Sequence, residues 1–208
     1  NVEDLIQKTS DIDIIFHCAA LKHVTLCEKS PDQAILTNII GIQNLVEACY
    51  FNNVKMMVFT SSDKAVNPTS VMGTSKLMGE RLITAANVNR RSKKTLFYST
   101  RFGNVLGSNG SVVPIFAEQI KEGNAITLTH NEMSRFVMSI DEAVKLIINS
   151  TEIAKGGEIF VTKMPVLKIK DLAIAMIEEL APKYGYSIES IDIEDIGMKP
   201  GEKLYEEL

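Results

Sequence analysis

Short apolar runs alternate along the chain with longer segments in which apolar residues recur at helical spacing. Residues 13–20 (DIIFHCAA), 55–62 (KMMVFTSS) and 94–102 (KTLFYSTRF) are near-continuous apolar runs typical of buried strands. Residues 31–53 and 69–91 lie between them and have the length and periodicity of amphipathic helices. Buried strands that alternate with helices predict an α/β protein with a parallel, doubly wound sheet.

Terminal signals support the first of these helices and a later one. Ser30 is expected as N-cap, with Pro31 at the first helical position and Gln33 at the third. Ser139 and Glu142 form a second capping-box pattern, at the start of a helix over 139–154.

The second half of the chain is less regular. A Gly-rich loop at 103–111 leads to a helix near Pro114, and short strands are expected at 125–130 and 156–162. In 168–180 the apolar residues fall on one helical face. These residues are Ile169, Leu172, Ala173, Met176, Ile177 and Leu180. The pattern predicts smaller mixed elements at the C-terminal end, with no clear linker between two domains.

Composition and charge exclude several classes of protein. The 208 residues are 45% hydrophobic and carry a formal charge of -4, which argues against binding nucleic acid by bulk electrostatics. Cys18, Cys27 and Cys49 are odd in number and lack metal-ligand spacing, so neither a disulfide framework nor a metal site is expected. No apolar run approaches the roughly 20 residues that a membrane-spanning helix requires. A reducing cytoplasm fits best.

Polar clusters follow three of the predicted strands: HCAALKH at 17–23, TSSDK at 60–64 and RFGNVLGSNGS at 101–111. A doubly wound sheet binds its ligands beyond the carboxyl ends of its strands. Each cluster alone could be a loop cap, but the three together predict one crevice.

Residues 61–76, SSDKAVNPTSVMGTSK, have the outline of a nicotinamide-enzyme active site, with a Ser, a loop and a Lys. The position four residues before Lys76, where an aromatic is expected, holds Met72. Since methionine cannot exchange a proton, either the site is inactive or another group in this stretch performs the chemistry.

Six ordered blocks carry a specific resemblance: AALKHV, TNIIGIQNLVEA, TSSDKAVNPTSVMGTSK, RFGNVLGSNGSVVPIF, SRFVMSIDEAV and KPGEKLYEEL. From Asp11 to the last residue the chain resembles UDP-N-acetylglucosamine 4,6-dehydratases, within the extended short-chain dehydrogenase/reductases. The resemblance implies a partial Rossmann-like sheet and a single domain fragment over 1–208. Residues 11–110 would belong to the Rossmann core and 111–208 mainly to substrate-binding elements. The family's G-x-x-G-x-x-G loop has no counterpart here, so we expect a fragment that lacks about three βα units and a short tail.

The resemblance also implies roles for the residues in the central block. Asp63 would be the general acid and Lys64 the base at sugar C5, which requires a protonated Asp and a neutral Lys in a desolvated crevice. Met72 would define a subgroup rather than a dead site, Ser62 could relay the C4 hydroxyl proton, and Lys76 would hold the nicotinamide ribose. Without the family match, Asp63 and Lys64 read as a surface ion pair.

The remaining implied positions bind ligands. The cofactor is NAD or NADP, which the sequence leaves undecided, and the substrate is UDP-N-acetylglucosamine or a related UDP-sugar. Arg135 is the strongest match, since a guanidinium fork suits a diphosphate. The implied cofactor contacts are Ala19, Ala20, Lys22 and Lys76, and the implied substrate contacts are His23, Asn104, Ser108, Arg135 and Glu202.

Two alternatives stay open: an epimerase or reductase of the same superfamily, and a non-catalytic dinucleotide-binding module. The adjacent Asp63 and Lys64 argue against both. The resemblance further implies a homo-oligomer that pairs through the helices at 31–53 and 69–91, in the cytoplasm or at the cytoplasmic face of a membrane.

Overall fold

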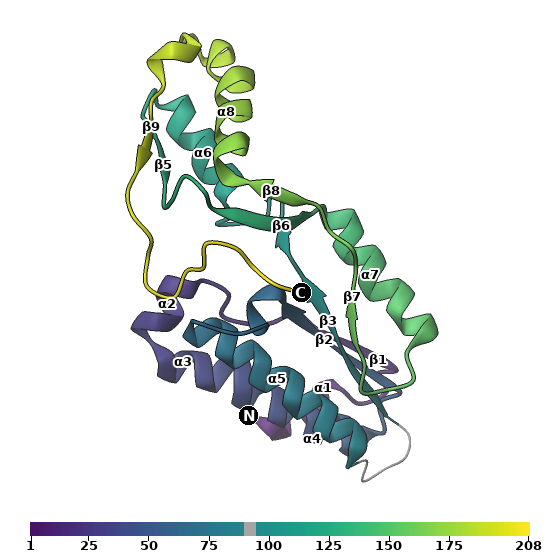
Figure 1. Cartoon of the computed structure of the whole chain (residues 1–208). Helices are drawn as coiled ribbons and strands as arrows, with labels where there is room; N and C mark the ends of the chain where they lie inside the picture. Colours follow the sequence, from purple (N-terminus) through teal and green to yellow (C-terminus); the bar gives the residue numbers. More distant parts are fainter. Residues whose placement is uncertain (90–94) are drawn as a thin grey trace. The chain divides into compact units, whose positions relative to one another are not determined.

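The computed structural model describes residues 1–89 and 95–208, which form two compact units (Figure 1). Unit 1 comprises residues 1–102, 144–162 and 207–208, and unit 2 comprises residues 103–143 and 163–206. The chain therefore leaves unit 1 and returns to it. The division expected near residue 110 did not anticipate that 144–162 join the first unit.

Unit 1 is built on a four-stranded sheet in which every neighbouring pair is parallel. The strand order is β1-β2-β3-β7, and His17, Phe59 and Ser99 lie side by side across the first three strands. The expected parallel α/β sheet is confirmed. The strands are β1 (Ile14–His17), β2 (Met56–Ser62), β3 (Leu96–Phe102) and β7 (Ile159–Val161).

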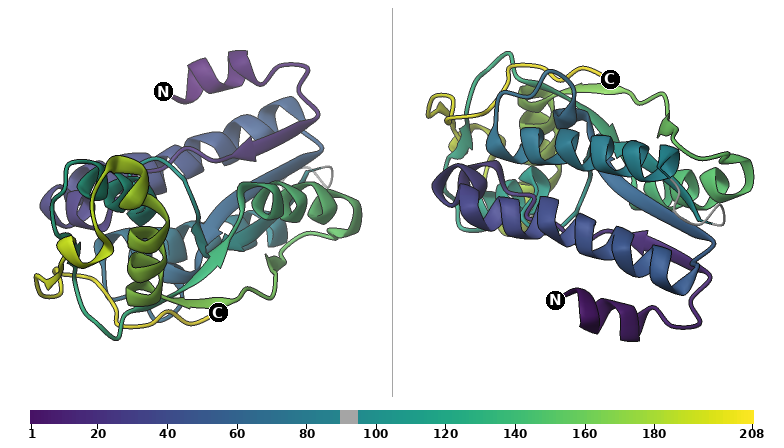
Figure 2. Two further views of the ribbon diagram at one scale, coloured as in Figure 1. Left: turned by 90° about the horizontal axis from the view of Figure 1, so that it is seen from above. Right: turned by 90° about the horizontal axis from the view of Figure 1, so that it is seen from below.

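Helices α4 and α5 pack together against one face of this sheet (Figure 2). Their buried residues, among them Ile42 of α4 and Ile83 of α5, meet Met57, Phe59 and Phe97 of the strands. The helices of unit 1 are α1 (Val2–Lys8), α2 (Val24–Lys29), α3 (Pro31–Ile35), the π-helix η1 (Leu36–Ile40), α4 (Gly41–Asn52), the 3-10 turn η2 (Asp63–Ala65), α5 (Val71–Val88) and the part of α7 (Ile140–Ile153) from Val144 onward.

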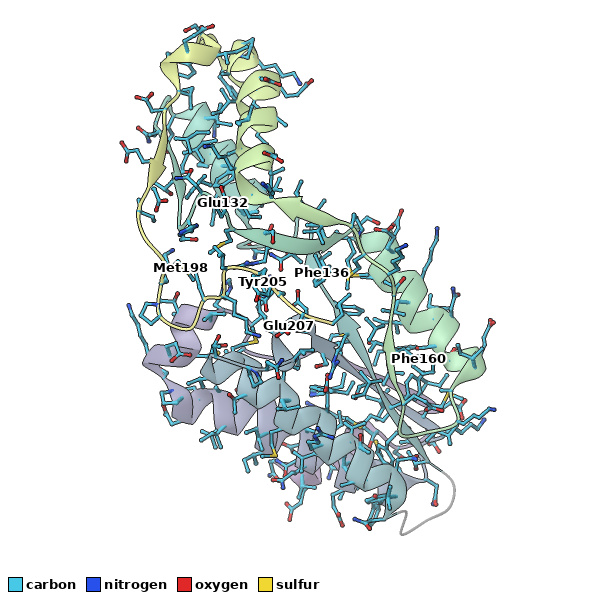
Figure 3. All side chains as sticks on the ribbon, viewed as in Figure 1. Glu132, Phe136, Phe160, Met198, Tyr205 and Glu207 are labelled. Carbon is cyan, nitrogen blue, oxygen red and sulfur yellow. The ribbon has the colours of Figure 1, made fainter. Side chains whose placement is uncertain are left out.

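The far side of β3 is buried as well. Tyr98 is fully buried and its ring meets Phe160 of β7 (labelled in Figure 3) edge-on, with ring centroids 5.6 Å apart. A strand buried on both faces explains the continuous apolar run from which it was predicted.

Unit 2 contains two small sheets and its own apolar core. Phe116 and Ile120 of α6 pack with Ile126 of β5 and with Ala173 and Ile177 of α8. The sheets are β4-β6-β8 and β5-β9. The elements are β4 (Asn104–Val105), α6 (Val112–Lys121), β5 (Ile126–Leu128), β6 (Ser134–Met138), β8 (Val166–Lys168), α8 (Ile169–Leu180), η3 (Pro182–Tyr184), η4 (Ile188–Ser190) and β9 (Ile193–Asp195).

The expected capping box at Ser139 is confirmed, and the capping signature at Ser30 is confirmed in its positions but not in its side-chain bonds. Ser139 Oγ accepts from Glu142 N at 3.1 Å, while a Glu142 oxygen accepts from Ser139 N at 2.7 Å. Ser30 is an N-cap, but its side chain makes no cap bond, and the Gln33 amide instead donates to Asp32. The predicted end of one helix at residue 91 and start of a strand at residue 94 lie outside the described residues.

One helical segment in the described part of the chain, Pro31–Asn52, is long and apolar enough to cross a membrane by length and composition alone. The expectation that no such run exists is therefore wrong by this measure. The same test is passed by core helices of soluble proteins, and here Ile42, Leu45 and Cys49 are buried in the core of unit 1. The segment is weak evidence for membrane insertion.

Candidate functional site

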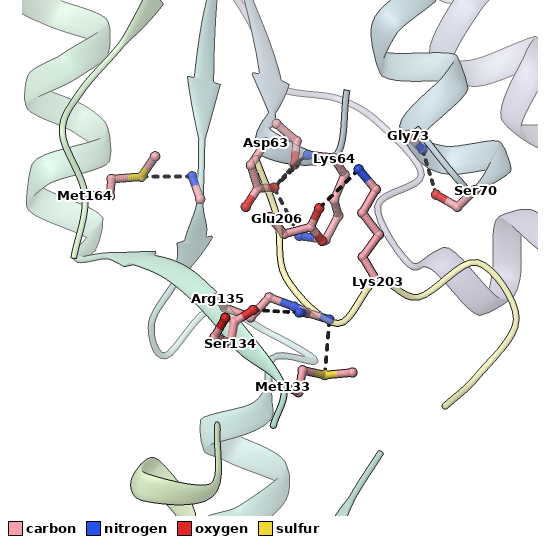
Figure 4. Close-up of polar contacts among 12 residues, drawn as sticks. Asp63, Lys64, Ser70, Gly73, Met133, Ser134, Arg135, Met164, Lys203 and Glu206 are labelled. Atoms are coloured by element: carbon pink, nitrogen blue, oxygen red, sulfur yellow. Dashed lines mark hydrogen bonds and ion pairs between the residues drawn. The ribbon is translucent and has the colours of Figure 1, made fainter. Parts of the chain in front are cut away.

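The carboxyl end of β2 turns directly into η2 and brings three predicted site residues into contact. Asp63 Oδ1 accepts hydrogen bonds from Ser62 Oγ at 2.8 Å and from the backbone N–H of Lys64 at 2.8 Å. It also receives Lys64 Nζ at 3.1 Å (Figure 4). The tight turn at the strand end thus directs a hydroxyl, a backbone N–H and an amine at one carboxylate oxygen.

The two carboxylate oxygens of Asp63 differ in their hydrogen-bond partners. The Asp63 side chain is fully buried, and Oδ2 has no hydrogen-bond partner among the described residues, whereas Lys64 is 21% exposed. A buried oxygen without a partner costs about 1–3 kcal/mol, and such groups call for an explanation. Because the carboxylate is fully buried and Lys64 is only partly exposed, the two residues do not form a surface ion pair. Oδ2 of Asp63 is an unsatisfied acceptor among the described residues.

Met72 lies on α5 and is 3% exposed. It packs in a small apolar cluster with Cys27 and Ala34, bordered by Leu21 and Val24. A thioether in such a cluster fills space and exchanges no proton.

Helix α5 approaches the η2 turn unusually closely at Gly73. A Cβ on Gly73 would lie 2.3 Å from the carbonyl oxygen of Lys64, which is inside van der Waals contact. Ser70 caps the helix by accepting from Gly73 N at 3.1 Å (Figure 4). The glycine therefore sets the distance between the helix that carries Met72 and Lys76 and the turn that carries Asp63.

Lys76 is buried, and its ammonium is held in place from two sides. Nζ donates to the carbonyl oxygen of Thr60 at 2.8 Å and lies 4.8 Å from the centre of the Phe59 ring. Burial lowers the pKa of Lys76 to about 8, while Cys18 and Glu80 act to raise it. At neutral pH the group is still mostly an ammonium, and a single hydrogen bond to the described residues leaves two of its three protons for a ligand.

The loop after β1 carries the expected cofactor contacts and is attached to α5 through Asn38. The Asn38 side chain accepts from Leu21 N at 2.8 Å, and donates to Leu21 O at 3.0 Å and to Ser75 Oγ at 2.9 Å. Asn38 lies in the π-helical turn η1, a feature frequent at functional sites. The predicted residues of this loop, Ala19, Ala20, Lys22 and His23, are exposed or half-buried.

Arg135 of β6 is 7% exposed and lines a pocket of about 210 Å³ in unit 2, with Phe136 and Tyr205 also on its wall (Figure 3). Its guanidinium donates to the carbonyl oxygens of Ser134 and Leu204 at 2.7 and 3.3 Å and to Met133 Sδ at 3.1 Å. These bonds tie the C-terminal segment to β6.

Three further predicted substrate contacts also lie in unit 2, whereas His23 lies in unit 1. Asn104 begins β4, and Ser108 is in the loop that follows. Glu202 accepts from Lys199 N at 3.0 Å and so closes its own turn. Unit 1 brings Ser62, Asp63 and Lys64 together and packs Met72 and Lys76 on the adjoining helix, while a shared site with the residues of unit 2 stays a prediction.

An ion pair that the sequence analysis did not single out lies beside Lys76. Arg101 at the end of β3 binds Glu80 of α5 through both carboxylate oxygens at 2.8 Å. The sequence spacing indicates that Glu80 is a neighbour of Lys76, because the two residues are four positions apart and so lie on the same helical face.

A parallel sheet with helices on its faces and a polar turn at the end of a central strand has the fold of the extended short-chain dehydrogenase/reductases. More narrowly, the chain belongs to the polysaccharide biosynthesis protein family, whose model matches residues 1–208.

Relatives in this family carry different names. A protein of Methanocaldococcus jannaschii named as an uncharacterized membrane protein is 56% identical over 95% of the chain and 60% of that relative. A UDP-N-acetylglucosamine 4,6-dehydratase (inverting) of Campylobacter jejuni is 43% identical over 98% of the chain and 58% of the relative. A UDP-glucose 4-epimerase of Rickettsia canadensis is 40% identical over 100% and 59%. The chain spans about three fifths of the length of these relatives.

Solved structures show the same fold. Pen from Bacillus thuringiensis superposes with a TM-score of 0.96 at 51% identity, over 100% of this chain and 63% of that one. The dTDP-glucose 4,6-dehydratase DesIV of Streptomyces venezuelae, solved with NAD bound, gives a TM-score of 0.86 at 20% identity, over 100% and 68%.

Proposed function

We propose that the complete protein is an NAD(P)-dependent 4,6-dehydratase of UDP-N-acetylglucosamine in polysaccharide or glycan biosynthesis. The observation that carries this proposal is the asymmetric carboxyl of Asp63, with three donors on Oδ1 and none from the described residues on buried Oδ2. A superfamily member that only moves a hydride has no need of such an acid beside a Lys. The 43% identity to a named dehydratase of this class supports the assignment.

The residues at Lys76 fit a nicotinamide cofactor. Its buried ammonium has two protons available after the bond to Thr60, which suits the paired hydroxyls of a ribose. When bound, the cofactor supplies hydride chemistry, accepting a hydride from sugar C4 and returning it to C6. Solved neighbours with NAD bound favour NAD over NADP.

Lys64 and Asp63 divide the elimination of water between them. Once C4 is a ketone, Lys64 Nζ takes the acidified proton from C5, and the resulting ammonium returns a proton to C5 when C6 is reduced. Asp63 donates a proton from Oδ2 to the C6 hydroxyl, which leaves as water, and the electron pair of the C5–H bond becomes the C5–C6 double bond. Oδ1 already receives three donors, so in the acid form the proton resides on Oδ2. Ser62 Oγ lies on the same carboxyl and can pass the C4 hydroxyl proton towards it.

Arg135 binds the UDP diphosphate in this proposal, with Asn104, Ser108, His23 and Glu202 as further substrate contacts and Ala19, Ala20 and Lys22 beside the cofactor. The pocket of about 210 Å³ at Arg135 supports the assignment, since two aromatic rings and a guanidinium line it. A buried guanidinium with donors beyond its backbone bonds suits a phosphate oxygen.

A UDP-sugar 4-epimerase is the second candidate, because relatives named as UDP-glucose 4-epimerases match the whole chain at about 40% identity. Incubating the full-length protein with NAD and UDP-N-acetylglucosamine, then identifying the product by NMR and mass spectrometry, separates the two. A 4-keto-6-deoxy sugar is expected, smaller than the substrate by one water. A C4 epimer of unchanged mass would replace the proposal with the second candidate, and no turnover would favour a binding module.

The protein is further proposed to act in the cytoplasm or at its membrane face, as a homo-oligomer. A groove of about 340 Å³ between α4 and α5 supports self-association, with Val46, Tyr50 and Leu82 on its walls. Sedimentation of the wild type against a Leu82→Arg variant would show a lower mass for the variant.

A further inference from the structure

Glu80 and Arg101 form a buried ion pair that no step of the proposed reaction uses. Two parallel bonds of 2.8 Å fix the carboxylate against the guanidinium, and the side chains are 1% and 16% exposed. Buried pairs of this kind are often replaceable by apolar side chains without loss of stability. Stability alone therefore does not account for the pair.

The position of Glu80 on α5 connects the pair to Lys76. The two residues are one helical turn apart on the same face, where side chains are neighbours. The Lys76 ammonium cannot move away from this face, because the Thr60 carbonyl and the Phe59 ring hold it from the strand side. The Glu80 carboxylate, which Arg101 holds, therefore lies on the same helical face as the Lys76 ammonium, which Thr60 and Phe59 hold.

Besides Glu80, His17 and Cys18 interact electrostatically with Lys76. Burial, followed by the charge of Lys76, lowers the pKa of His17 to about 4, so the imidazole is neutral. Asp63 and Lys64 on η2 pair with each other. Cys18 and Glu80 both act to raise the pKa of Lys76, and Glu80 is the one of the two that Arg101 holds.

We propose that the Glu80–Arg101 pair is a positioning element that sets the charge of the Lys76 ammonium. Glu80 keeps the buried ammonium protonated, and Arg101 prevents the carboxylate from binding Lys76 directly and withdrawing it from a ligand. The inference rests on the proposed cofactor role of Lys76, but the charge of Lys76 can be measured without any cofactor.

Removing Arg101 and removing Glu80 should shift the pKa of Lys76 in opposite directions. Arg101→Gln leaves an unpaired carboxylate beside the ammonium, which favours the charged form and raises the pKa of Lys76. Glu80→Gln leaves an unpaired guanidinium, which disfavours the ammonium and lowers that pKa. A merely structural pair would loosen the fold in both variants and shift both titrations the same way, towards the ordinary lysine value.

The test is an NMR titration of the full-length protein labelled with 13Cε-lysine, with the Lys76 signal identified by its loss in Lys76→Arg. We expect displacements on the order of one pH unit, upward for Arg101→Gln and downward for Glu80→Gln. Lys55→Gln is the matched control, since it removes one charge from an exposed pair, Lys55–Asp13, whose side chains are 72% and 71% exposed. It should leave the Lys76 titration unchanged.

A double variant covers the case in which a single change prevents folding. Glu80→Leu combined with Arg101→Met removes both charges and keeps the volume, which buried pairs often tolerate. Because Glu80 acts to raise the pKa of Lys76, that pKa should fall in the double variant, by less than in Glu80→Gln alone, where an unpaired guanidinium remains. An unchanged Lys76 titration in the double variant, or shifts of equal sign in the two single variants, overturns the inference. Failure of the proposed function is seen separately, in the product of the wild-type reaction.

Discussion

At the scale of single residues, the turn after β2 gives each group a different environment. Lys64 touches Asp63 at 3.1 Å and is partly exposed, whereas Met72 is packed among apolar side chains. Lys64 can therefore take part in proton transfer, whereas Met72 fills space in the apolar cluster.

This difference predicts two contrasting variants of the full-length enzyme. Met72→Leu should keep most of the activity, because Leu fills nearly the same volume and such exchanges usually cost less than about 1.5 kcal/mol. Lys64→Ala should lower the elimination rate by a factor on the order of 100 or more, the usual contribution of a positioned base. The measurement is the rate of 4-keto-6-deoxy product.

The first step of the reaction, oxidation at C4, should remain possible in Lys64→Ala and gives a second measurement. Oxidation at C4 precedes removal of the C5 proton, so reduced cofactor should still form and be visible by its absorbance. Equal inactivity of Met72→Leu and Lys64→Ala, or wild-type product release by Lys64→Ala, would place the proton chemistry outside this turn.

Arg135 gives a second prediction at this scale. Arg135→Ala should raise KM for the UDP-sugar far more than it lowers kcat, since a bond made equally in ground and transition states is uniform binding. Arg135→Lys keeps the charge but loses the fork, so its KM should lie between the two. An unchanged KM in Arg135→Ala would remove this residue from the substrate site.

At the scale of elements, the spacing between α5 and η2 depends on Gly73. Gly73→Ala would force a Cβ to within 2.3 Å of the Lys64 carbonyl oxygen, so the helix or the turn must shift. We expect a loss of about 1–3 kcal/mol in unfolding free energy and at least a tenfold drop in activity, since small displacements of catalytic groups are costly.

Gly41 is the matched control for Gly73. It too lies in a helix, but a Cβ there would meet only the Leu36 carbonyl oxygen at 3.7 Å, an ordinary contact. Gly41→Ala should leave activity unchanged and add up to about 1 kcal/mol of stability, because alanine favours helix. Urea unfolding and turnover together check both variants, and wild-type behaviour of Gly73→Ala would contradict the predicted close approach.

The same scale shows how much the sequence could predict. Elements with a long periodic pattern, such as α5 and α8, were placed to within a few residues, and the parallel sheet followed from apolar runs, of which β2 and β3 are buried and β1 is largely exposed. β4, β6, β8 and β9 were missed, because strands of two to five residues are too short to show a period and depend on partners distant in sequence. The π-helical turn at Asn38 was missed as well, and the side-chain bonds of Asn38 reach Leu21 and Ser75, which are distant in sequence.

For the candidate site, too, contacts that are local in sequence could be predicted and contacts between distant segments could not. The contacts within Ser62, Asp63 and Lys64 are local, and the sequence predicted their proximity. The free oxygen of Asp63 and the Glu80–Arg101 pair depend on burial and on strands brought together by the fold, which no local pattern reveals.

At the scale of the whole molecule, the 208-residue chain has only part of what holds a dinucleotide. Lys76 can bind a ribose, but the sequence has no G-x-x-G-x-x-G loop to cradle a pyrophosphate with backbone N–H groups at a helix N-terminus. β1 has one strand partner in the described sheet, and Ile14 and Phe16 on it are exposed. An open strand edge with apolar side chains favours association with other chains.

This chain alone should therefore bind NAD weakly, with a Kd above roughly 1 mM, equivalent to less than about 4 kcal/mol of binding free energy. The full-length protein should bind it far more tightly, and Lys76→Ala in that protein should weaken binding through the lost ribose contact. Calorimetric titration of the three proteins under one set of conditions checks both statements, with sedimentation to correct for association of the short chain. Micromolar affinity of the 208-residue chain would contradict the prediction, because the residues present here would then hold the whole dinucleotide without a glycine-rich cradle.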